Sequence, residues 1–220
     1  MIGGTPSVSA SVYTQLSGMA AEIERISGPD RYATSRALVE SAFAAGGAPL
    51  VYVATGQNFP DALSAGAPAG AAGAPVVLVD GSASALDAGT AELLDSLGTT
   101  EIKVLGGTGS VSAGIFDDLA EIGTAIRIAG DSRYETSRLV NADAFDSADR
   151  VFLATGLNFP DALAGSAWAG SIDAPLYVVP GTCISPDVRD DITSLGATRV
   201  TLLGGLPSLS LPVESLTVCE

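Results

Sequence analysis

An internal repeat is the feature that most constrains how this chain can fold. Two sequence blocks occur twice in the same order and a third occurs three times, so the chain holds two full copies of one unit and an extra tail. The matched blocks are 25–36 with 127–138, 54–63 with 154–163, and 3–9 with 106–112 and 204–210. We therefore divide the chain into residues 1–21, the tail of a preceding repeat that is expected to pack on copy 1, residues 22–123 as copy 1, and residues 124–220 as copy 2.

Each unit alternates apolar, strand-like segments with helical ones. In copy 1, strands are predicted at 24–26, 50–54, 75–79 and 102–105, and helices at 32–45, from Pro60, at 90–97 and after Ser112. Copy 2 repeats this order, with strands near 151–154, 176–179 and 200–203. Such alternation implies parallel strands joined by right-handed crossovers. The predicted fold class is α/β, with two tandem Rossmann-like repeat domains, parallel sheets and flanking helices. Because no linker separates the copies, we expect them to touch.

The charge balance narrows the range of partners. The net charge is −15 and only 10 residues are Lys or Arg, so the overall field of the chain does not attract nucleic acid. The same field repels an acidic polymer unless local arginines or bridging cations intervene. The chain has no histidine, which excludes Ser-His-Asp and Cys-His catalysis and histidine-bound zinc. We predict no cofactor, no metal site and no nucleic-acid partner.

The two cysteines, Cys183 and Cys219, are 36 residues apart, which is no metal-ligand spacing. An even count is typical of a disulfide in a secreted protein, whereas two buried thiols in a cytosolic protein are the alternative. We predict the disulfide. No signal peptide or membrane span is visible in the sequence, and because the chain begins in mid-unit, an export signal could lie upstream.

Polar residues gather where strands are predicted to end. The Asn-Phe-Pro-Asp-Ala-Leu block places Asn58 and Asp61 in copy 1 and Asn158 and Asp161 in copy 2. The carboxyl ends of parallel strands share one edge of a sheet, where ligands usually bind, so each set is expected on the rim of its domain. One interpretation is structural: the asparagine caps the helix or forms a turn, and the aspartate complements the helix dipole. The other is a polar rim that binds an anion or a sugar hydroxyl.

A second pair of candidates is Arg31 with Tyr32, which recurs as Arg133 with Tyr134. Each arginine either pairs with the aspartate of its own copy or presents a planar fork to a phosphate or carboxylate. The single tryptophan, Trp168, either stacks on a sugar or packs between helices or copies. No catalytic residue is assigned. The candidate ligand-binding residues are Arg31, Tyr32, Asn58, Asp61, Arg133, Tyr134, Asn158 and Asp161.

The three blocks together resemble a known bacterial family. The motifs Arg-Ile-x-Gly-x-x-Arg-Tyr-x-Thr-Ser, Ala-Thr-Gly-x-Asn-Phe-Pro-Asp-Ala-Leu and Gly-Gly-x-x-Ser-x-Ser look like the cell wall binding repeat 2 family, over essentially the whole chain. The Ala- and Gly-rich, Lys-poor composition resembles an actinobacterial member. The resemblance implies a secreted module of the cell envelope, as in S-layer proteins. It implies non-covalent anchoring of an exported protein to a Gram-positive wall through an anionic secondary polysaccharide, without catalysis.

Two other functions stay open at this point. The same rim would bind another protein if the chain were a surface adhesion or structural module. An enzyme acting on wall glycans would use paired carboxylates, but these recur once per unit, and repetition favours multivalent binding. The family's repeats commonly come in threes, so two full copies are a departure. We therefore expect either a missing third repeat or self-association through exposed apolar surface.

Overall fold

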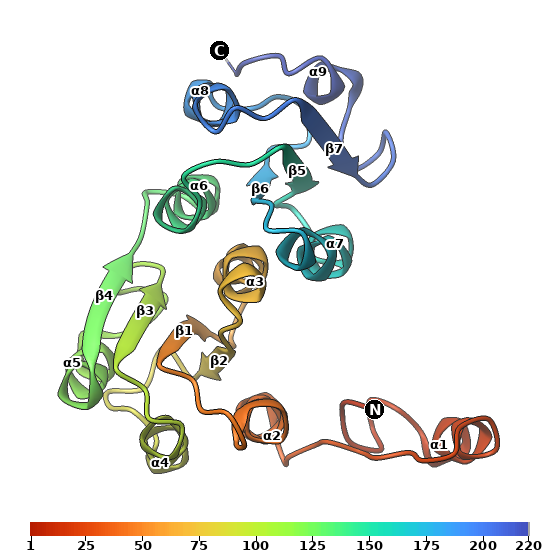
Figure 1. Ribbon diagram of the computed structural model, residues 1–220, viewed down its shortest axis with the longest axis vertical. Helices are drawn as coiled ribbons and strands as arrows, with labels where there is room; N and C mark the ends of the chain where they lie inside the picture. Colours follow the sequence, from red (N-terminus) through yellow and green to blue (C-terminus); the bar gives the residue numbers. More distant parts are fainter. Residues whose placement is uncertain (220) are drawn as a thin grey trace.

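The computed structural model describes residues 1–219 and shows two α/β lobes, from one of which the N-terminal segment extends sideways (Figure 1). One sheet has the strand order β2-β1-β3-β4, the other β6-β5-β7, and every pairing is parallel. The predicted fold class is confirmed. The strands are β1 (Leu50–Thr55), β2 (Val76–Val79), β3 (Glu101–Leu105), β4 (Thr124–Ile128), β5 (Arg150–Thr155), β6 (Leu176–Val179) and β7 (Arg199–Leu203). The helices are α1 (Ala10–Ser17), α2 (Arg31–Phe43), α3 (Pro60–Ala72), α4 (Ala88–Ser96), α5 (Ala113–Ile122), α6 (Arg133–Ala144), α7 (Pro160–Ser171), α8 (Pro186–Ser194) and α9 (Leu211–Glu214).

Local sequence signals set most helix starts. The side chains of Asp30, Asp87 and Ser112 each accept a hydrogen bond from the backbone N–H three residues further on, at 2.7, 3.0 and 3.2 Å. Helices α3 and α7 begin at Pro60 and Pro160, where a missing N–H costs nothing because the first helical N–H groups lack intrahelical partners. The helices therefore begin close to the predicted positions in both copies.

The first strand of each repeat completes the sheet of the preceding unit. Strand β4 lies in the part of the sequence assigned to copy 2, yet it pairs with β3 over five residue pairs, ending at Leu105 opposite Ile128. In the same way, Ile26 forms a parallel bridge with Ile2 in the N-terminal tail. The sheet of one unit is thus closed by the segment that leads into the next.

Small residues let the two copies pack closely. Helices α3 and α7 lie side by side between the two sheets (Figure 1). A Cβ atom on Gly66 would lie 2.7 Å from the Ser166 Cβ, and one on Gly70 would lie 3.1 Å from the Gly170 Cα. Since neither glycine could carry a side chain without moving a helix, the expected contact between the copies is confirmed and depends on these small residues.

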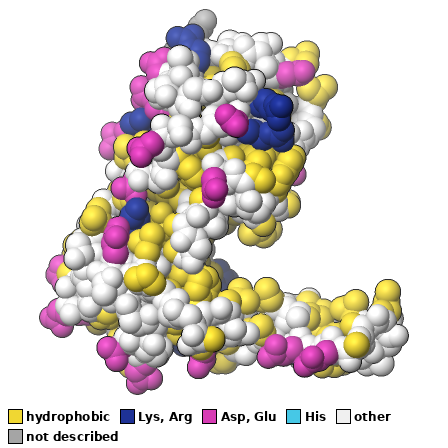
Figure 2. All heavy atoms as spheres, viewed as in Figure 1, with side chains coloured by type: hydrophobic (Ala, Val, Ile, Leu, Met, Phe, Trp, Pro, Cys, Tyr) yellow, Lys and Arg dark blue, Asp and Glu magenta, His cyan; other side chains and the backbone are white. Residues whose placement is uncertain are grey.

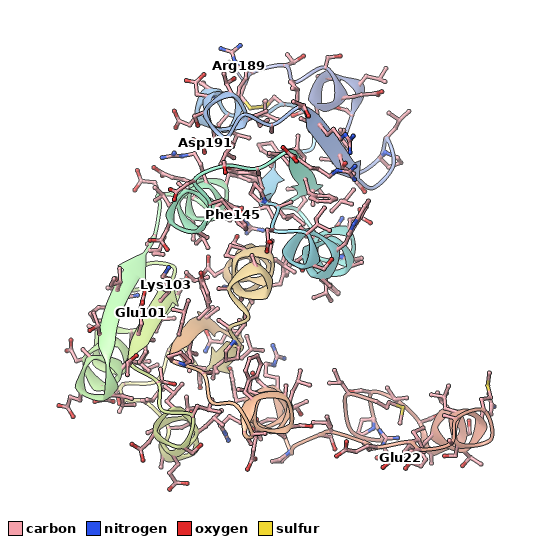
Figure 3. The ribbon with its side chains drawn as sticks, viewed as in Figure 1. Glu22, Glu101, Lys103, Phe145, Arg189 and Asp191 are labelled. Carbon is pink, nitrogen blue, oxygen red and sulfur yellow. A yellow bond between two sulfur atoms is a disulfide. The ribbon has the colours of Figure 1, made fainter. Side chains whose placement is uncertain are left out.

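An ion pair adds to this contact. The Lys103 ammonium lies 2.7 Å from a carboxylate oxygen of Asp143, so it joins β3 of the first sheet to α6 (Figure 3). The same ammonium lies 5.6 Å from the ring centroid of Tyr52. The only lysine in the chain therefore holds α6 over the first sheet.

The N-terminal tail differs from the expectation that it packs on copy 1. Helix α1 has no buried residue, its apolar side chains Val12 and Leu16 stay 41% and 39% exposed, and Figure 1 shows it projecting away from α2. The tail is held instead by Arg25, which donates hydrogen bonds to the carbonyl oxygens of Gly3 and Val8. The short helix has too little apolar surface to cover copy 1, so its anchor is polar and lies in residues 23–26.

The end of copy 2 follows a different path from the end of copy 1. Helix α9 lasts one turn, and the chain then returns to Ile184, which forms a parallel bridge with Val218. The predicted disulfide is confirmed: Cys183 and Cys219 are bonded, with their Cα atoms 5.1 Å apart. Within the described residues, β7 pairs with β5 alone. Among residues 1–219 no helix combines the length and apolar character that a membrane crossing requires.

Candidate functional site

The rim of copy 1 lies at the carboxyl ends of β1 and β3, where turns at Gly56 and Gly106 follow the strands. Asn58 lies on the segment that leads from β1 into α3, and Asp61 lies in the first turn of α3. The residue that caps α3 is Phe59, and it makes no side-chain capping bond, so the predicted capping role of Asn58 is wrong. The Asn58 side chain is therefore free of that structural task and lines a hollow in the rim.

This hollow is built by both copies. Because β4 completes the first sheet, the loop that follows it lies beside the Gly-Gly turn of copy 1. The enclosed volume is about 290 Å³. We name this hollow the composite site. Its lining residues are Asn58, Phe59, Pro60, Asp61, Gly106, Gly107 and Ser110 from copy 1 and Gly130, Asp131, Ser132, Arg133 and Thr136 from copy 2.

Asp61 is the buried charge of the composite site. Asp61 is 6% exposed, and this burial raises the pKa of its carboxyl. A hydrogen bond from Ser110 and the positive charge of Arg133 lower the same pKa by a smaller amount. Gly106 adopts φ 89°, and any side chain there would collide with the Asp61 carboxylate. A carboxyl group kept buried at a cost to its ionised form, beside an arginine from the other copy, is typical of a functional site.

The Arg-Tyr pairs hold the turns that follow β1 and β5. Nη1 of Arg133 donates a hydrogen bond of 2.8 Å to the carbonyl oxygen of Gly156, and Nη1 of Arg31 donates to that of Gly56. The tyrosine rings cover the same turns, since a Cβ on Gly156 would lie 2.7 Å from Cε1 of Tyr134. The pairing of each arginine with the aspartate of its own copy is not formed among the described residues, because each guanidinium bonds backbone oxygen instead. Tyr32 occupies the corresponding place in copy 1.

Aromatic side chains extend the rim across the boundary between the copies. The rings of Phe59 and Phe159 have centroids 5.7 Å apart, and the Arg133 guanidinium lies 5.9 Å from the Phe59 ring centroid. Phe159 and Leu163 stay 49% and 58% exposed and border a second, more open hollow of about 810 Å³. The rim therefore joins a polar hollow to an apolar one.

Copy 2 carries only half of the equivalent site. Asp161 lies against the Gly-Gly turn of copy 2, since a Cβ on Gly204 would lie 2.6 Å from its Oδ2. Asn158 is exposed at the start of α7. Within residues 1–219 no further repeat supplies an arginine there as Arg133 does for copy 1. Of the eight predicted residues, the structure therefore brings together Asn58, Asp61 and Arg133 in the composite site, and Arg31 lines the more open hollow with Asn58.

Sequence reasoning missed the residue that locks the composite site together. Arg127, on β4, donates a 2.8 Å hydrogen bond to the carbonyl oxygen of Gly106 and a 3.4 Å bond to that of Ser112. Arg25 makes the equivalent contacts in the tail. Arg25 and Arg127 both stand in the matched blocks, and this recurrence was the signal that could have identified them. Their structural role could not be predicted, because it depends on the pairing of strands from different units.

The Thr-Ser pair of the first block serves the fold. Thr136 accepts a hydrogen bond from the Gly130 N–H at 3.0 Å, and Ser137 accepts one from the Val178 N–H at 3.0 Å. The second bond places α6 against the edge strand β6. These hydroxyls are therefore satisfied within the protein and leave the arginine, aspartate and asparagine as the groups that can meet a ligand.

The composite site can bind but has few groups for chemistry. It offers a guanidinium, an amide and backbone N–H groups of a glycine turn as donors, the ring of Phe59 as an apolar surface, and the carboxylates of Asp61 and Asp131 as acceptors for hydroxyl groups. Within residues 1–219 no group of three His, Cys, Asp or Glu side chains is placed to hold a metal ion.

Comparison with known proteins shows which family carries this arrangement. The family model for "Cell wall binding domain 2 (CWB2)" matches residues 25–116 and 127–214. The chain belongs to the cell wall binding domain 2 family.

Curated relatives and solved structures agree with this assignment. The chain is 26% identical to N-acetylmuramoyl-L-alanine amidase LytC of Bacillus subtilis (strain 168), over 98% of this chain and 42% of that protein, and 28% identical to the amidase enhancer of the same organism, over 98% of this chain and 29% of that protein. The chain thus spans less than half the length of these relatives. Cwp8 from Clostridium difficile superposes with a TM-score of 0.86 at 26% identity, covering 98% of this chain and 36% of Cwp8. Cwp6 from Clostridium difficile gives a TM-score of 0.84 at 24% identity, over 93% of this chain and 33% of Cwp6, which shows the shared fold.

Proposed function

We propose that this cell wall binding module anchors an exported protein non-covalently to a Gram-positive wall by binding an anionic secondary polysaccharide at the rim, without catalysis. The amidase relatives are named for an activity of proteins more than twice as long, and that activity is not carried over. A secreted, wall-associated location follows from the proposal. An actinobacterial source stays a prediction from composition, and the relatives above come from Bacillus and Clostridium.

The observation that supports this proposal is the composite site. Arg133 reaches from one copy over Asn58 and Asp61 of the other, so a polymer segment bound there would contact both copies at once. Arg133 uses one nitrogen of its fork on the Gly156 carbonyl, which leaves donors for a phosphate or carboxylate. We propose Asn58, Asp61 and Arg133 as the central ligand contacts, with Arg31, Tyr32 and Tyr134 shaping the rim beside them.

The test compares two equivalent asparagines. Asn58→Ala removes an amide from the composite site, and Asn158→Ala removes the matching amide from the incomplete site. Loss of one hydrogen bond predicts roughly fivefold weaker binding to purified walls for Asn58→Ala and little change for Asn158→Ala. Neither residue caps its helix, so the melting temperature should stay unchanged in both. Equal binding by the wild type and Asn58→Ala would contradict the assignment of this site.

The polymer itself is tested by stripping the walls. Walls treated with acid to remove secondary polymers should no longer retain the chain, whereas retention by stripped walls would point to peptidoglycan or protein as the ligand. Because the chain carries a net charge of −15, moderate salt or divalent cations should improve binding by screening repulsion. Binding that only decays with salt would contradict this electrostatic account.

A further inference from the structure

A second hollow lies at the opposite end of copy 2 from the rim. It opens at the amino ends of β5 and β7, beside the last turns of α7, and encloses about 650 Å³. Figure 2 shows a group of cationic side chains, which in this lobe are arginines, next to hydrophobic ones. Arg150, Trp168 and Arg199 line the hollow, together with Asp149 and Asp173.

The aromatic wall of this hollow is Trp168. Its indole is 47% exposed and meets the buried Phe152 ring edge-on, with centroids 4.8 Å apart. The Arg150 guanidinium lies 5.5 Å from the Trp168 centroid and 5.9 Å from that of Phe152. The tryptophan is therefore held by packing on one side and open to solvent on the other, which is the arrangement that lets an indole stack on a sugar ring. The packing that was the alternative is made against Phe152 of β5 in the same copy, and it leaves part of the indole accessible.

The cationic wall consists of two arginines that face each other across neighbouring strands. Arg150 and Arg199 are partners in the β5–β7 register. Among the described residues neither forms an ion pair within 4.0 Å, although Asp149 and Asp173 border the same hollow. Like charges directly opposite in a sheet are destabilising. In a chain with 10 cationic and 25 acidic residues, two arginines that stand side by side and form no ion pair with the carboxylates nearby are placed for an external anion.

Copy 1 lacks every part of this arrangement. Leu50 and Glu101 occupy the register of Arg150 and Arg199, and Pro68 stands where copy 2 has the tryptophan. The corresponding surface of copy 1 holds a smaller hollow of about 370 Å³, which is bordered by the end of α6, where Asp143 pairs with Lys103. The two arginines and the tryptophan are thus specific to copy 2, whose hollow is the larger and, within residues 1–219, has no helix in the place that α6 takes beside copy 1.

We propose that Arg150, Trp168 and Arg199 form a binding site for a sugar that carries an anionic group. The sugar ring stacks on the open face of Trp168, and its phosphate or carboxylate lies between the two guanidinium groups. The biological source of the sugar rests on the proposed wall-binding function. The site adds a contact at the far end of copy 2, so one polymer chain or two could be held at separated points with a gain in avidity.

A second copy of the chain is a poorer occupant of this surface. The helix that would take the place of α6 is α2, and α2 presents Ser41 at the position where α6 presents Asp143. Its docking would cover Arg150 and Arg199 without bringing that carboxylate, and covering unpaired charges is costly. Charge complementarity therefore favours an anionic ligand over a second copy.

The test uses the fluorescence of Trp168, which is the only tryptophan in the chain. The full chain is titrated with glucose 6-phosphate, glucuronate, glucose and inorganic phosphate. A saturable change is expected with at least one charged sugar, at least about tenfold tighter than with glucose or phosphate alone, because only the charged sugar meets both walls. The tighter of the two charged sugars identifies the anionic group. Equal affinity for phosphate alone would show an adventitious ion only and would overturn the sugar assignment.

Two substitutions that copy 1 already carries test the arginines without threatening the fold. Arg150→Leu and Arg199→Glu should each weaken binding of the charged sugar about tenfold, since each removes a charge-assisted contact. The control is Arg189→Glu, which changes the charge as much as Arg199→Glu does but lies on α8, away from the hollow (Figure 3), and should leave binding unchanged. Unchanged binding in the first two variants would overturn the site.

The sugar site, the anchoring function and an interface between copies can fail separately. If the wild-type chain fails to bind purified walls but still binds the charged sugar, the anchoring function fails and the site stands. If light scattering shows a dimer that Arg199→Glu abolishes, and charged sugars neither bind nor dissociate it, the surface is an interface between copies and the sugar assignment is overturned.

Discussion

Copies 1 and 2 share their motifs but differ in how their sheets are closed. In copy 1, β4 covers the edge of β3, and Ile102, Val104 and Leu105 are fully buried. In copy 2, β7 has no such neighbour among the described residues, and its equivalent side chains are only partly buried. The difference shows that one repeat of this kind is not a self-contained domain, because its fourth strand belongs to the next repeat.

The two copies also stabilise their ends by different chemistry. Copy 1 uses Arg127, which ties β4 to the Gly-Gly turn through two carbonyl oxygens. Copy 2 uses the bond between Cys183 and Cys219, which turns the chain back toward α8. Among the described residues, a covalent link therefore fixes the end of copy 2, whereas a strand and an arginine of the following unit fix the end of copy 1.

The largest expected effect comes from removing that covalent link. Replacing Cys183 and Cys219 together with Ala should lower the free energy of unfolding of copy 2 by about 3–4 kcal/mol, since the bond closes a loop of 36 residues. Thermal unfolding of the oxidised wild type and the double variant measures the difference. A loss below about 1 kcal/mol would mean that packing of α9 already holds this end.

A matched pair of leucines measures how much strand β4 contributes. Leu105→Ala should cost about 3 kcal/mol, because Leu105 is fully buried in a cluster that includes Ile128 of β4. Leu203→Ala, at the equivalent position of β7, should cost about 1 kcal/mol, because its side chain is only partly buried. Chemical denaturation of both variants checks the prediction, and equal losses would contradict the open edge of copy 2.

The smallest expected effect concerns the two aspartates of the rim. Burial raises the pKa of Asp61 above its ordinary value of 3.8, so the folded chain binds this proton more tightly than the unfolded chain. The free energy of unfolding therefore falls as pH rises from 3.8 through the higher folded pKa, and stays lowered above it. Asp61→Asn should raise stability at neutral pH, by no more than about 1 kcal/mol after loss of the charged hydrogen bond, and the gain should vanish in acid.

The control for this prediction is Asp161→Asn in copy 2. Asp161 is more exposed than Asp61, so the same substitution should change the melting temperature less. Melting curves of both variants at neutral and acidic pH measure the two changes in stability. A gain of equal size at both pH values would show that the charge of Asp61 is not what costs stability.

The sequence by itself determined the repeat, the α/β class and most element positions. Matched blocks reveal a repeat without any knowledge of its structure, and helix starts depend on neighbours such as Ser112 and Pro60. The strands at 50–55 and 150–155 follow from local apolar runs. The disulfide followed from an even count of cysteines.

Only the tertiary structure decided which residues meet. The sequence suggested that each arginine pairs with the aspartate of its own copy, but β4 crosses to the first sheet and brings Arg133 to Asp61 instead. In the same way, Arg150 and Arg199 are 49 residues apart and become neighbours because β5 pairs with β7. Pairing between distant strands is set by the burial of whole sheet faces and by the path of the connecting helices, which no local pattern of residues records.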